Sequence, residues 1–190
     1  MGYHTFPLEN ADALEEPTRF RFCSREELLA LIDPSPAAVV ADLGSGTGFY
    51  TDEVAPFVEH CYAVDVQTGM HDRYREKGLP GNVEPVTAGV EDLPLPEDAL
   101  DAVYSTMTYH EYAGEETLAE VGRVLRPGGV HAVVDWTGEG SGESGPPTDE
   151  RFALADALEH HREAGFRVDE ARTRPETFLL SARTPSGDRR

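Results

Sequence analysis

The chain alternates short apolar runs with stretches of mixed polarity. A short apolar run that is rich in β-branched residues and bounded by turn residues is typical of a strand buried in a parallel sheet. Pro85 lies inside the third such run, where proline is disfavoured because it has no N–H to donate to a neighbouring strand. We expect five strands of this kind, at residues 37–43, 60–66, 82–88, 100–107 and 130–136.

Helical patterns separate these runs. Residues 24–32 begin with Ser24 and carry Glu27 three positions later, which is the pattern of a capping box. Residues 114–125 place apolar side chains on one helical face. Because strands alternate with helices, the sequence predicts an α/β fold with a mostly parallel sheet. We also expect helices at 49–58, 68–78 and 150–165, a turn at 126–129, a flexible loop at 138–149, and a final strand pair at 166–174 and 176–184.

The chain length of 190 residues suits one α/β domain. We expect that domain to span residues 1–183, with 1–23 as an N-terminal segment and 184–190 as a flexible tail. No apolar run approaches the roughly 20 residues that a membrane helix needs. The first residues show neither the basic nor the apolar region of a signal peptide. These observations predict a cytoplasmic protein that is not inserted into a membrane.

Acidic residues dominate the composition. There are 36 Asp and Glu against 16 Lys and Arg, which gives a formal net charge of -20, and Lys77 is the only lysine. Such an acidic surface repels phosphate backbones, which disfavours nucleic acid as a partner. Salt screens the repulsion between carboxylates and hydrated carboxylates keep a chain soluble, so this composition favours adaptation to a salt-rich cytoplasm. The alternative is an ordinary acidic protein.

The cysteine pattern indicates no metal or redox centre. Cys23 and Cys61 are the only cysteines, and they are far apart in the sequence. A metal or redox centre would call for closer spacing or for histidines nearby. We therefore expect two free thiols and no metal site.

A glycine-rich segment, GSGTG at 44–48, follows the first expected strand and precedes a helix. Glycine allows a sharp turn and a close approach of the backbone to a ligand. Ligands of open α/β sheets bind at the carboxyl ends of the strands, so we expect Gly44, Gly46 and Gly48 to line a cofactor cleft. Asp65 ends the second strand beside that cleft, where its carboxylate can accept hydrogen bonds from both hydroxyls of a ribose.

The glycine spacing differs from that of a dinucleotide site. The fingerprint G-x-G-x-x-G/A needs a third small residue that Phe49 puts out of register. Asp42, two residues before the first glycine, suits a ligand with a cationic amino group better than it suits a pyrophosphate. A nicotinamide-dependent oxidoreductase is therefore a less favoured alternative.

Longer stretches of the chain resemble the class I S-adenosylmethionine-dependent methyltransferases, in particular the ubiquinone/menaquinone-methyltransferase-like branch with a type 11 methyltransferase domain. VVADLGSGTGFYT resembles the first motif of that family, and YAVDVQTGM resembles the second. VEDLPLPEDALDAVYSTMTYHEY and EVGRVLRPGGVHAVVDW are similar to its later segments. The similarity covers about residues 24–183. It implies a three-layer Rossmann-like fold, with a mostly parallel seven-stranded sheet and an antiparallel last strand, and S-adenosyl-L-methionine as cofactor.

The resemblance also assigns roles to single residues. It places Asp42 and the three glycines against the methionine portion of the cofactor, and Asp65 against the ribose. Relatives often carry Asp where this chain has Gly89, which leaves the contact with the adenine amino group to Glu91, to the backbone or to water. The remaining cofactor residues that it implies are Val66, Met70 and Val90, with Ser105 and Thr106 beside the methyl group.

His110 is the candidate catalytic base, because it follows the fourth strand on the ligand side and histidine exchanges protons near neutral pH. A structural histidine that hydrogen-bonds the backbone is the alternative. Asp135 and Trp136 end the fifth strand on the same side. We expect them to line the substrate pocket together with Tyr109. Core packing is the alternative for Tyr109 and for Trp136.

Other aromatic and histidine residues have less specific interpretations. Tyr3, His4 and Phe6 could belong to a lid over the cleft or to a frayed terminus. His160 and His161 are adjacent on a late helix, and we expect them on its solvated face because neighbouring helix positions point in different directions.

The expected function is methyl transfer to an oxygen or carbon atom of a small organic molecule. Amino-directed relatives carry a Pro-Pro-aromatic motif after the fourth strand, and this chain has STMTYHEY there. The alternatives are an S-adenosylmethionine-binding protein without activity, acting as a sensor or a partner subunit, and the oxidoreductase named above.

Overall fold

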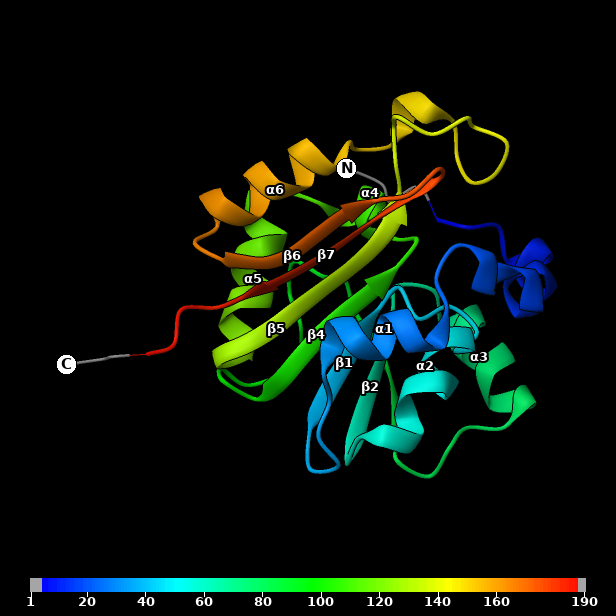
Figure 1. Ribbon diagram of the computed structural model, residues 1–190. Coiled ribbons are helices and arrows are strands. Elements are labelled where there is room, and N and C mark those ends of the chain that lie inside the picture. Colours follow the sequence, from blue (N-terminus) through cyan, green and yellow to red (C-terminus); the bar gives the residue numbers. More distant parts are fainter. Residues whose placement is uncertain (1–4, 188–190) are drawn as a thin grey trace.

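The computed structural model describes residues 5–187, so Tyr3, His4 and the last residues of the expected tail lie outside the described residues. A seven-stranded sheet forms the centre of the molecule (Figure 1). Its strands are β1 (Val39–Leu43), β2 (His60–Asp65), β3 (Val83–Thr87), β4 (Leu100–Thr106), β5 (Leu125–Trp136), β6 (Arg167–Thr173) and β7 (Thr177–Arg183). The helices are α1 (Arg25–Ile32), α2 (Phe49–Val54), α3 (Thr68–Lys77), α4 (Tyr109–Tyr112), α5 (Glu115–Val124) and α6 (Leu154–Glu163).

The strand order is β3-β2-β1-β4-β5-β7-β6. Neighbours among β1 to β5 pair in parallel, whereas β7 is antiparallel to both β5 and β6. The expected Rossmann-like sheet with an antiparallel last strand is thus confirmed. The chain order reverses at β1, which lies between β2 and β4, and such a switch point is where open α/β sheets bind ligands. Pro85 is accommodated because β3 is an edge strand.

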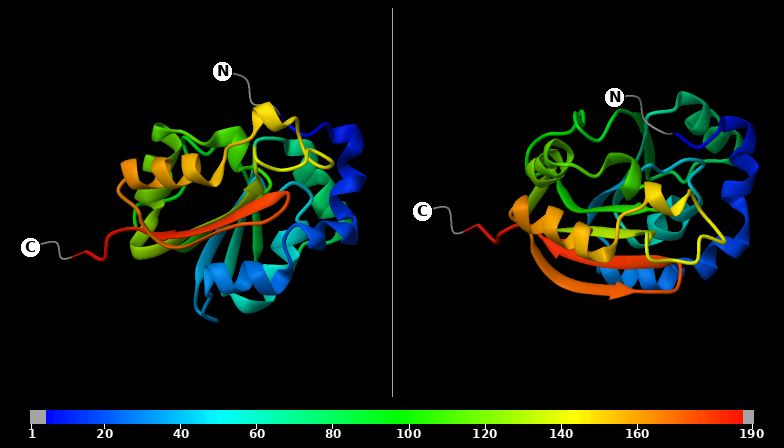
Figure 2. Two further views of the ribbon diagram at one scale, coloured as in Figure 1. Left: turned by 45° about the horizontal axis from the view of Figure 1, so that its top comes forward. Right: turned by 90° about the horizontal axis from the view of Figure 1, so that it is seen from above.

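Two hydrophobic clusters cover the two faces of the sheet. Side chains alternate along β1, so Val40 packs with α1 and α2 whereas Ala41 and Leu43 pack with α5. The helices α1 to α3 lie on one face, and α4 to α6 lie on the other (Figures 1 and 2). This arrangement fixes the carboxyl ends of the parallel strands at one end of the molecule.

Most expected elements are confirmed within a few residues. The capping box of α1 is present, with Ser24 Oγ accepting from the Glu27 backbone N–H and Glu27 accepting from the Ser24 N–H. The expected turn at 126–129 is instead part of β5, where the pairing register with β4 shifts. The short helix α4, which carries His110, was not expected from the sequence.

The N-terminal segment folds into two 3-10 helices, η1 (Leu8–Glu15) and η2 (Pro17–Arg21). A third, η3 (Ala55–Phe57), follows α2. A fourth, η4 (Thr148–Glu150), lies at the end of the 138–149 loop. The segment and the 138–149 loop lie side by side at the carboxyl end of the sheet, in blue and yellow in Figure 2. Among residues 5–187, no helix has both the length and the apolar character required to cross a membrane.

The expectation that His161 is solvated is wrong. Its side chain is fully buried against β5, and its Nε2 lies 3.0 Å from Nδ1 of His131. Leu154, Ala157, Leu158 and His161 follow the 3.6-residue helical period, so the apolar face of α6 includes position 161. Adjacent His160 is half-buried and hydrogen-bonds the Tyr109 hydroxyl.

Candidate active site

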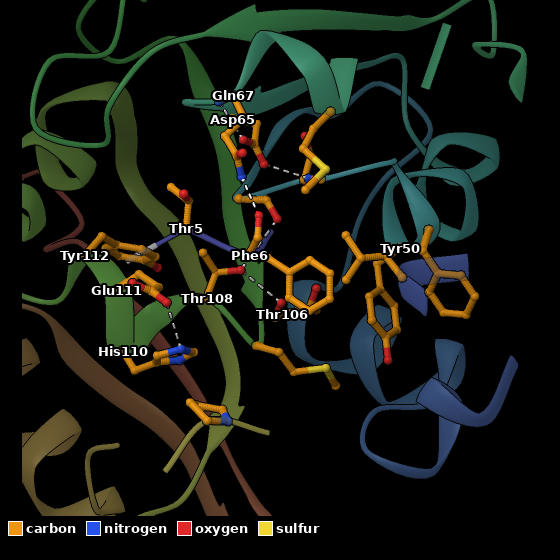
Figure 3. Close-up of a pocket in the computed structure, with 18 of the residues that line it drawn as sticks. Thr5, Phe6, Tyr50, Asp65, Gln67, Thr106, Thr108, His110, Glu111 and Tyr112 are labelled. Carbon is orange, nitrogen blue, oxygen red and sulfur yellow. Dashed lines mark hydrogen bonds and ion pairs between the residues drawn. The ribbon is translucent and has the colours of Figure 1, made fainter. Parts of the chain in front are cut away.

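The carboxyl ends of β1, β2, β4 and β5 open into one cavity of about 740 Å³. This volume is in the range typical of small-molecule sites. Residues from each strand end line the cavity, and the N-terminal segment and the 138–149 loop close it from outside. Figure 3 shows Asp65 and Gln67 on one side of the cavity and His110, Glu111 and Tyr112 on another.

The glycine loop is held by its backbone and leaves no room for side chains. The N–H groups of Gly44 and Ser45 both donate to the Val64 carbonyl, which ties the loop to β2. Gly44 has φ +72°, and a Cβ there would overlap the Thr108 side chain. Gly48 has φ +82°, and a Cβ there would overlap the Tyr74 ring. Gly44 and Gly46 line the cavity, whereas Gly48 lies behind the loop at the start of α2.

Asp65 lines the cavity at the end of β2. Its Oδ2 accepts from the Gly46 N–H at 2.9 Å, and its Oδ1 accepts from the Gln67 N–H at 2.8 Å. Burial raises the pKa of Asp65, and these two hydrogen bonds oppose the rise. Each carboxylate oxygen has a second lone pair, so Asp65 can still accept from two ligand hydroxyls.

Asp42 lies behind the glycine loop and does not line the cavity. The Thr51 hydroxyl donates to its Oδ2 at 2.6 Å, while its buried Oδ1 has no hydrogen-bond partner within the described chain. Burial raises the pKa of Asp42 to about 7, against the lowering effect of hydrogen bonds from Thr51 and Tyr104. A nearby cation would satisfy this oxygen and favour the charged carboxylate.

An apolar wall follows Asp65 along the cavity. Val66, Met70 and Val90 contribute to it, together with Ala88. Glu91 does not line the cavity, but its carboxylate fills the space that a side chain at Gly89 would occupy. This part of the cavity suits the flat, largely apolar face of a nucleoside base.

His110 lines the far side of the cavity and is held by Asp135. Asp135 is fully buried and accepts from both the backbone N–H of His110 (2.6 Å) and its Nδ1 (3.0 Å). The Nε2 of His110 lies 3.3 Å from Glu111 Oε1. Burial lowers the pKa of His110, but the hydrogen bond and charge of Asp135 and then Glu111 outweigh burial, so the net shift is upward.

The other expected residues divide between the cavity and the core. Thr106 and Trp136 line the cavity. Ser105, Tyr109 and Asp135 lie behind its wall: Ser105 hydrogen-bonds the Tyr112 hydroxyl at 2.8 Å, and Tyr109 packs in the core. Phe6 lines the cavity as the lid hypothesis requires, and the Gln67 side chain donates to its carbonyl.

Sequence reasoning missed several lining residues. Arg19, Gln67, Thr108 and Glu111 all face the cavity. Of these four residues, only Gln67 could have been predicted from its neighbours in the sequence, because it lies two positions after Asp65, the last residue of β2. In residues 5–187, no group of three His, Cys, Asp or Glu side chains could hold a metal ion.

Comparisons with known proteins agree with this geometry. A family model described as a methyltransferase domain matches residues 41–133. The chain is 32% identical over 110 residues to a ubiquinone/menaquinone biosynthesis C-methyltransferase of Vibrio campbellii, covering 54% of this chain and 42% of that protein. It is similar in structure to an S-adenosylmethionine-dependent methyltransferase from Aquifex aeolicus, with a TM-score of 0.86, 28% identity, and coverage of 94% of this chain and 99% of that one.

The chain belongs to the class I S-adenosylmethionine-dependent methyltransferases. Its cofactor is therefore S-adenosylmethionine. It is also 33% identical over 107 residues to a sterol 24-C-methyltransferase of Gibberella zeae, covering 53% of this chain and 28% of that protein. The chain thus spans less than half the length of these curated relatives. The fold alone is shared with the [4+2]-cyclase SpnF, at a TM-score of 0.75 and 21% identity, with coverage of 86% of this chain and 80% of that one.

The residues of this chain fit the cofactor. Asp65 keeps free acceptor positions for ribose hydroxyls. Asp42 does not line the cavity, but its buried Oδ1 has no hydrogen-bond partner within the described residues. The apolar wall beside Asp65 suits adenine. These are the complementary chemical groups that a sulfonium nucleoside with an amino-acid end needs.

Proposed function

We propose that this chain, as one domain spanning residues 1–183, transfers the methyl group of S-adenosylmethionine to an oxygen or carbon atom of a small organic acceptor. The observation that carries the proposal is that the glycine loop, Asp65 and His110 line the same cavity, with Asp135 holding His110 from behind the wall. A nucleoside held at Asp65 and an acceptor at His110 would share one enclosed space.

The bound cofactor supplies an electrophilic methyl group on a sulfonium. The protein then has to orient the acceptor and exclude water, and positioning of this kind can contribute about 7–11 kcal/mol to the rate. Aromatic side chains in the cavity wall support this role, because Phe22 and Trp136 pack with ring centroids 4.6 Å apart and Tyr112 lies beside His110 in Figure 3. We infer that the acceptor presents an apolar body to these rings.

His110 is suited to accept a proton from the acceptor. Asp135 takes the Nδ1–H, which fixes the tautomer with Nε2 as the basic nitrogen. Once Nε2 is protonated, Glu111 stabilises the imidazolium on its other side. The pair of carboxylates therefore makes His110 a stronger base than a free imidazole, in line with its raised pKa.

Salt adaptation is part of the same proposal. The chain carries 36 acidic residues against 16 basic ones, and its only lysine, Lys77, forms ion pairs with Glu15 and Asp52. An excess of carboxylates repels itself at low ionic strength and is screened at high ionic strength. We infer that the protein works in a salt-rich cytoplasm.

The test is turnover of S-adenosylmethionine labelled in its methyl group, with small hydroxylated and carbon-acid acceptors, in concentrated KCl. We expect label in an extractable organic product and formation of S-adenosylhomocysteine. Tight binding of the cofactor without label transfer to any acceptor would favour a sensor or partner subunit instead.

A further inference from the structure

Arg19 lies on η2, the second 3-10 helix of the N-terminal segment, and lines the cavity. Its guanidinium carbon is 5.1 Å from the Phe49 ring centroid and 5.2 Å from that of Tyr50. Both rings belong to α2, directly after the glycine loop. Tyr50 lies away from His110 in Figure 3, so Arg19 belongs to the glycine-loop side of the cavity and not to the acceptor side.

This guanidinium has few partners. Its Nη1 donates to the Leu14 carbonyl at 2.7 Å, and its Nη2 lies 3.8 Å from Met107 Sδ. Within residues 5–187, no carboxylate oxygen lies within 4.0 Å of Arg19. A guanidinium carries five N–H donors, so most of its hydrogen-bonding capacity remains for a ligand.

The lack of a counter-ion is unusual in this chain, where acidic residues outnumber basic ones by more than two to one. Burial lowers the pKa of Arg19, although nearby Tyr50 and Asp42 oppose the shift. A half-buried cation without a carboxylate is unfavourable unless a ligand supplies one. The planar guanidinium matches a carboxylate in particular, because it can donate two parallel hydrogen bonds to it.

We propose that Arg19 binds the α-carboxylate at the amino-acid end of the cofactor. Arg19 would supply the positive charge that the carboxylate of a zwitterionic amino-acid group needs. This inference rests on the methyltransferase function proposed above, and it makes the N-terminal segment part of the cofactor site.

The experiment is a calorimetric comparison of three ligands. S-adenosylhomocysteine carries the whole amino-acid end, its decarboxylated analogue keeps only the amino group, and 5′-methylthioadenosine lacks both. Each is titrated into the wild-type chain, Arg19→Met and the control Arg21→Met. Arg21 is an exposed neighbour on the same helix, with its guanidinium over the Phe22 ring.

In the wild-type protein we expect the decarboxylated analogue to bind roughly 10- to 100-fold more weakly than S-adenosylhomocysteine, the scale of charged hydrogen bonds. In Arg19→Met, S-adenosylhomocysteine should weaken by a similar factor, while the decarboxylated analogue and 5′-methylthioadenosine keep their wild-type affinities. Arg21→Met should bind all three ligands as the wild type does. The effect of the carboxylate in the wild type, compared with its effect in Arg19→Met, isolates the pair as in a double-mutant cycle.

Two results separate the possible failures. If all three ligands bind the wild-type chain but removing the carboxylate costs nothing, the role of Arg19 is wrong and the methyltransferase function stands. If neither S-adenosylhomocysteine nor 5′-methylthioadenosine binds the wild type, both the role of Arg19 and the proposed methyltransferase function are wrong. The comparison of ligands on the wild type needs no variant, so it can overturn the proposal even if Arg19→Met does not fold. A carboxylate effect that persists undiminished in Arg19→Met would overturn the proposal as well.

Discussion

His131 donates its Nδ1–H to Nε2 of His161 across 3.0 Å in the core between β5 and α6. The direction follows from His161, whose Nδ1 lies 2.7 Å from the Ala157 carbonyl and must carry the proton, because a carbonyl only accepts. His131 Nε2 then accepts from the Tyr112 hydroxyl at 3.3 Å. Tyr112 lines the cavity, so this chain of hydrogen bonds anchors the cavity wall to the core.

Both imidazoles must stay neutral in the folded protein. Burial lowers the pKa of His161 to about 4, and burial followed by the neighbouring His161 lowers that of His131 well below its ordinary value. Below about pH 6.5 the unfolded chain binds protons on these imidazoles and the folded chain does not. The free energy of unfolding therefore falls as pH falls below about 6.5, and these two groups do not reduce it above that pH. Asp42 acts oppositely, since its raised pKa favours the folded state as pH falls below about 7.

Replacing His161 with Gln should therefore flatten the pH dependence of unfolding. We expect His161→Gln to be less stable than the wild type at pH 7.5 and the gap to shrink by up to about 3 kcal/mol towards pH 4. Urea unfolding at several pH values measures this, and the comparison cancels the contribution of Asp42. Tyr112→Phe is the control, because it removes a hydroxyl from the same network and should cost about 1 kcal/mol at every pH. A gap for His161→Gln that stays constant with pH would contradict the neutral pair.

The rate of methyl transfer should rise with pH. His110 acts as a base only when neutral, so its raised pKa predicts a midpoint above 6.5. His110→Gln should lower kcat by about 10²- to 10⁴-fold and remove this step, while the affinity for S-adenosylhomocysteine stays the same. Asp135→Asn should move the midpoint to lower pH, because it removes the charge that raises the His110 pKa.

A pH–rate profile of each variant checks this, with His60→Gln as a control distant from the cavity. If His110→Gln kept the wild-type kcat, His110 would not be the catalytic base, and catalysis would depend on positioning of the acceptor alone.

Arg151 holds the 138–149 loop over the cavity. Its side chain is fully buried, donates to the carbonyls of Pro146 and Ser144, and lies 5.5 Å from the Trp136 ring centroid. We expect Arg151→Met to lose about 2–4 kcal/mol of stability, because buried carbonyls would lose their donors. The KM for the acceptor should also rise, with little change in cofactor binding.

Limited proteolysis would report opening of this loop, with Arg162→Met on α6 as the comparison. Cleavage of the loop at the wild-type rate in Arg151→Met would show that other contacts hold it.

High salt should stabilise the protein. Screening weakens the repulsion that a net charge of -20 creates, so the melting temperature should rise by several degrees between 0.1 M and 2 M KCl. Differential scanning calorimetry measures this directly. A melting temperature that is constant or falls with KCl would argue for an ordinary acidic protein.

The features that the sequence predicted are those encoded locally. Apolar runs predicted the five strands that pair in parallel, and a glycine loop directly after a strand placed Gly44, Gly46 and Asp65 at one end of the sheet. The position of Asp65 could be predicted because it is the last residue of a strand, and the strand is recognisable from a few neighbouring residues.

The features that were missed depend on tertiary contacts. The segment with Arg19 forms 3-10 helices without a clear period, and its place over the cavity follows from contacts with α2. The flexible loop expected at 138–149 is held by Arg151, which donates to the carbonyls of Ser144 and Pro146 and whose burial no local pattern shows. The apolar period of α6, in contrast, could have identified His161 as buried.

The central claim is that the glycine loop and Asp65 bind a sulfonium nucleoside, and calorimetric titration of S-adenosylhomocysteine tests it most directly. We predict one binding site in the wild-type chain, no binding of NAD, and a loss of about 1.5–3 kcal/mol of binding free energy in Asp65→Ala. Binding of NAD without S-adenosylhomocysteine, or an unchanged affinity in Asp65→Ala, would contradict the account.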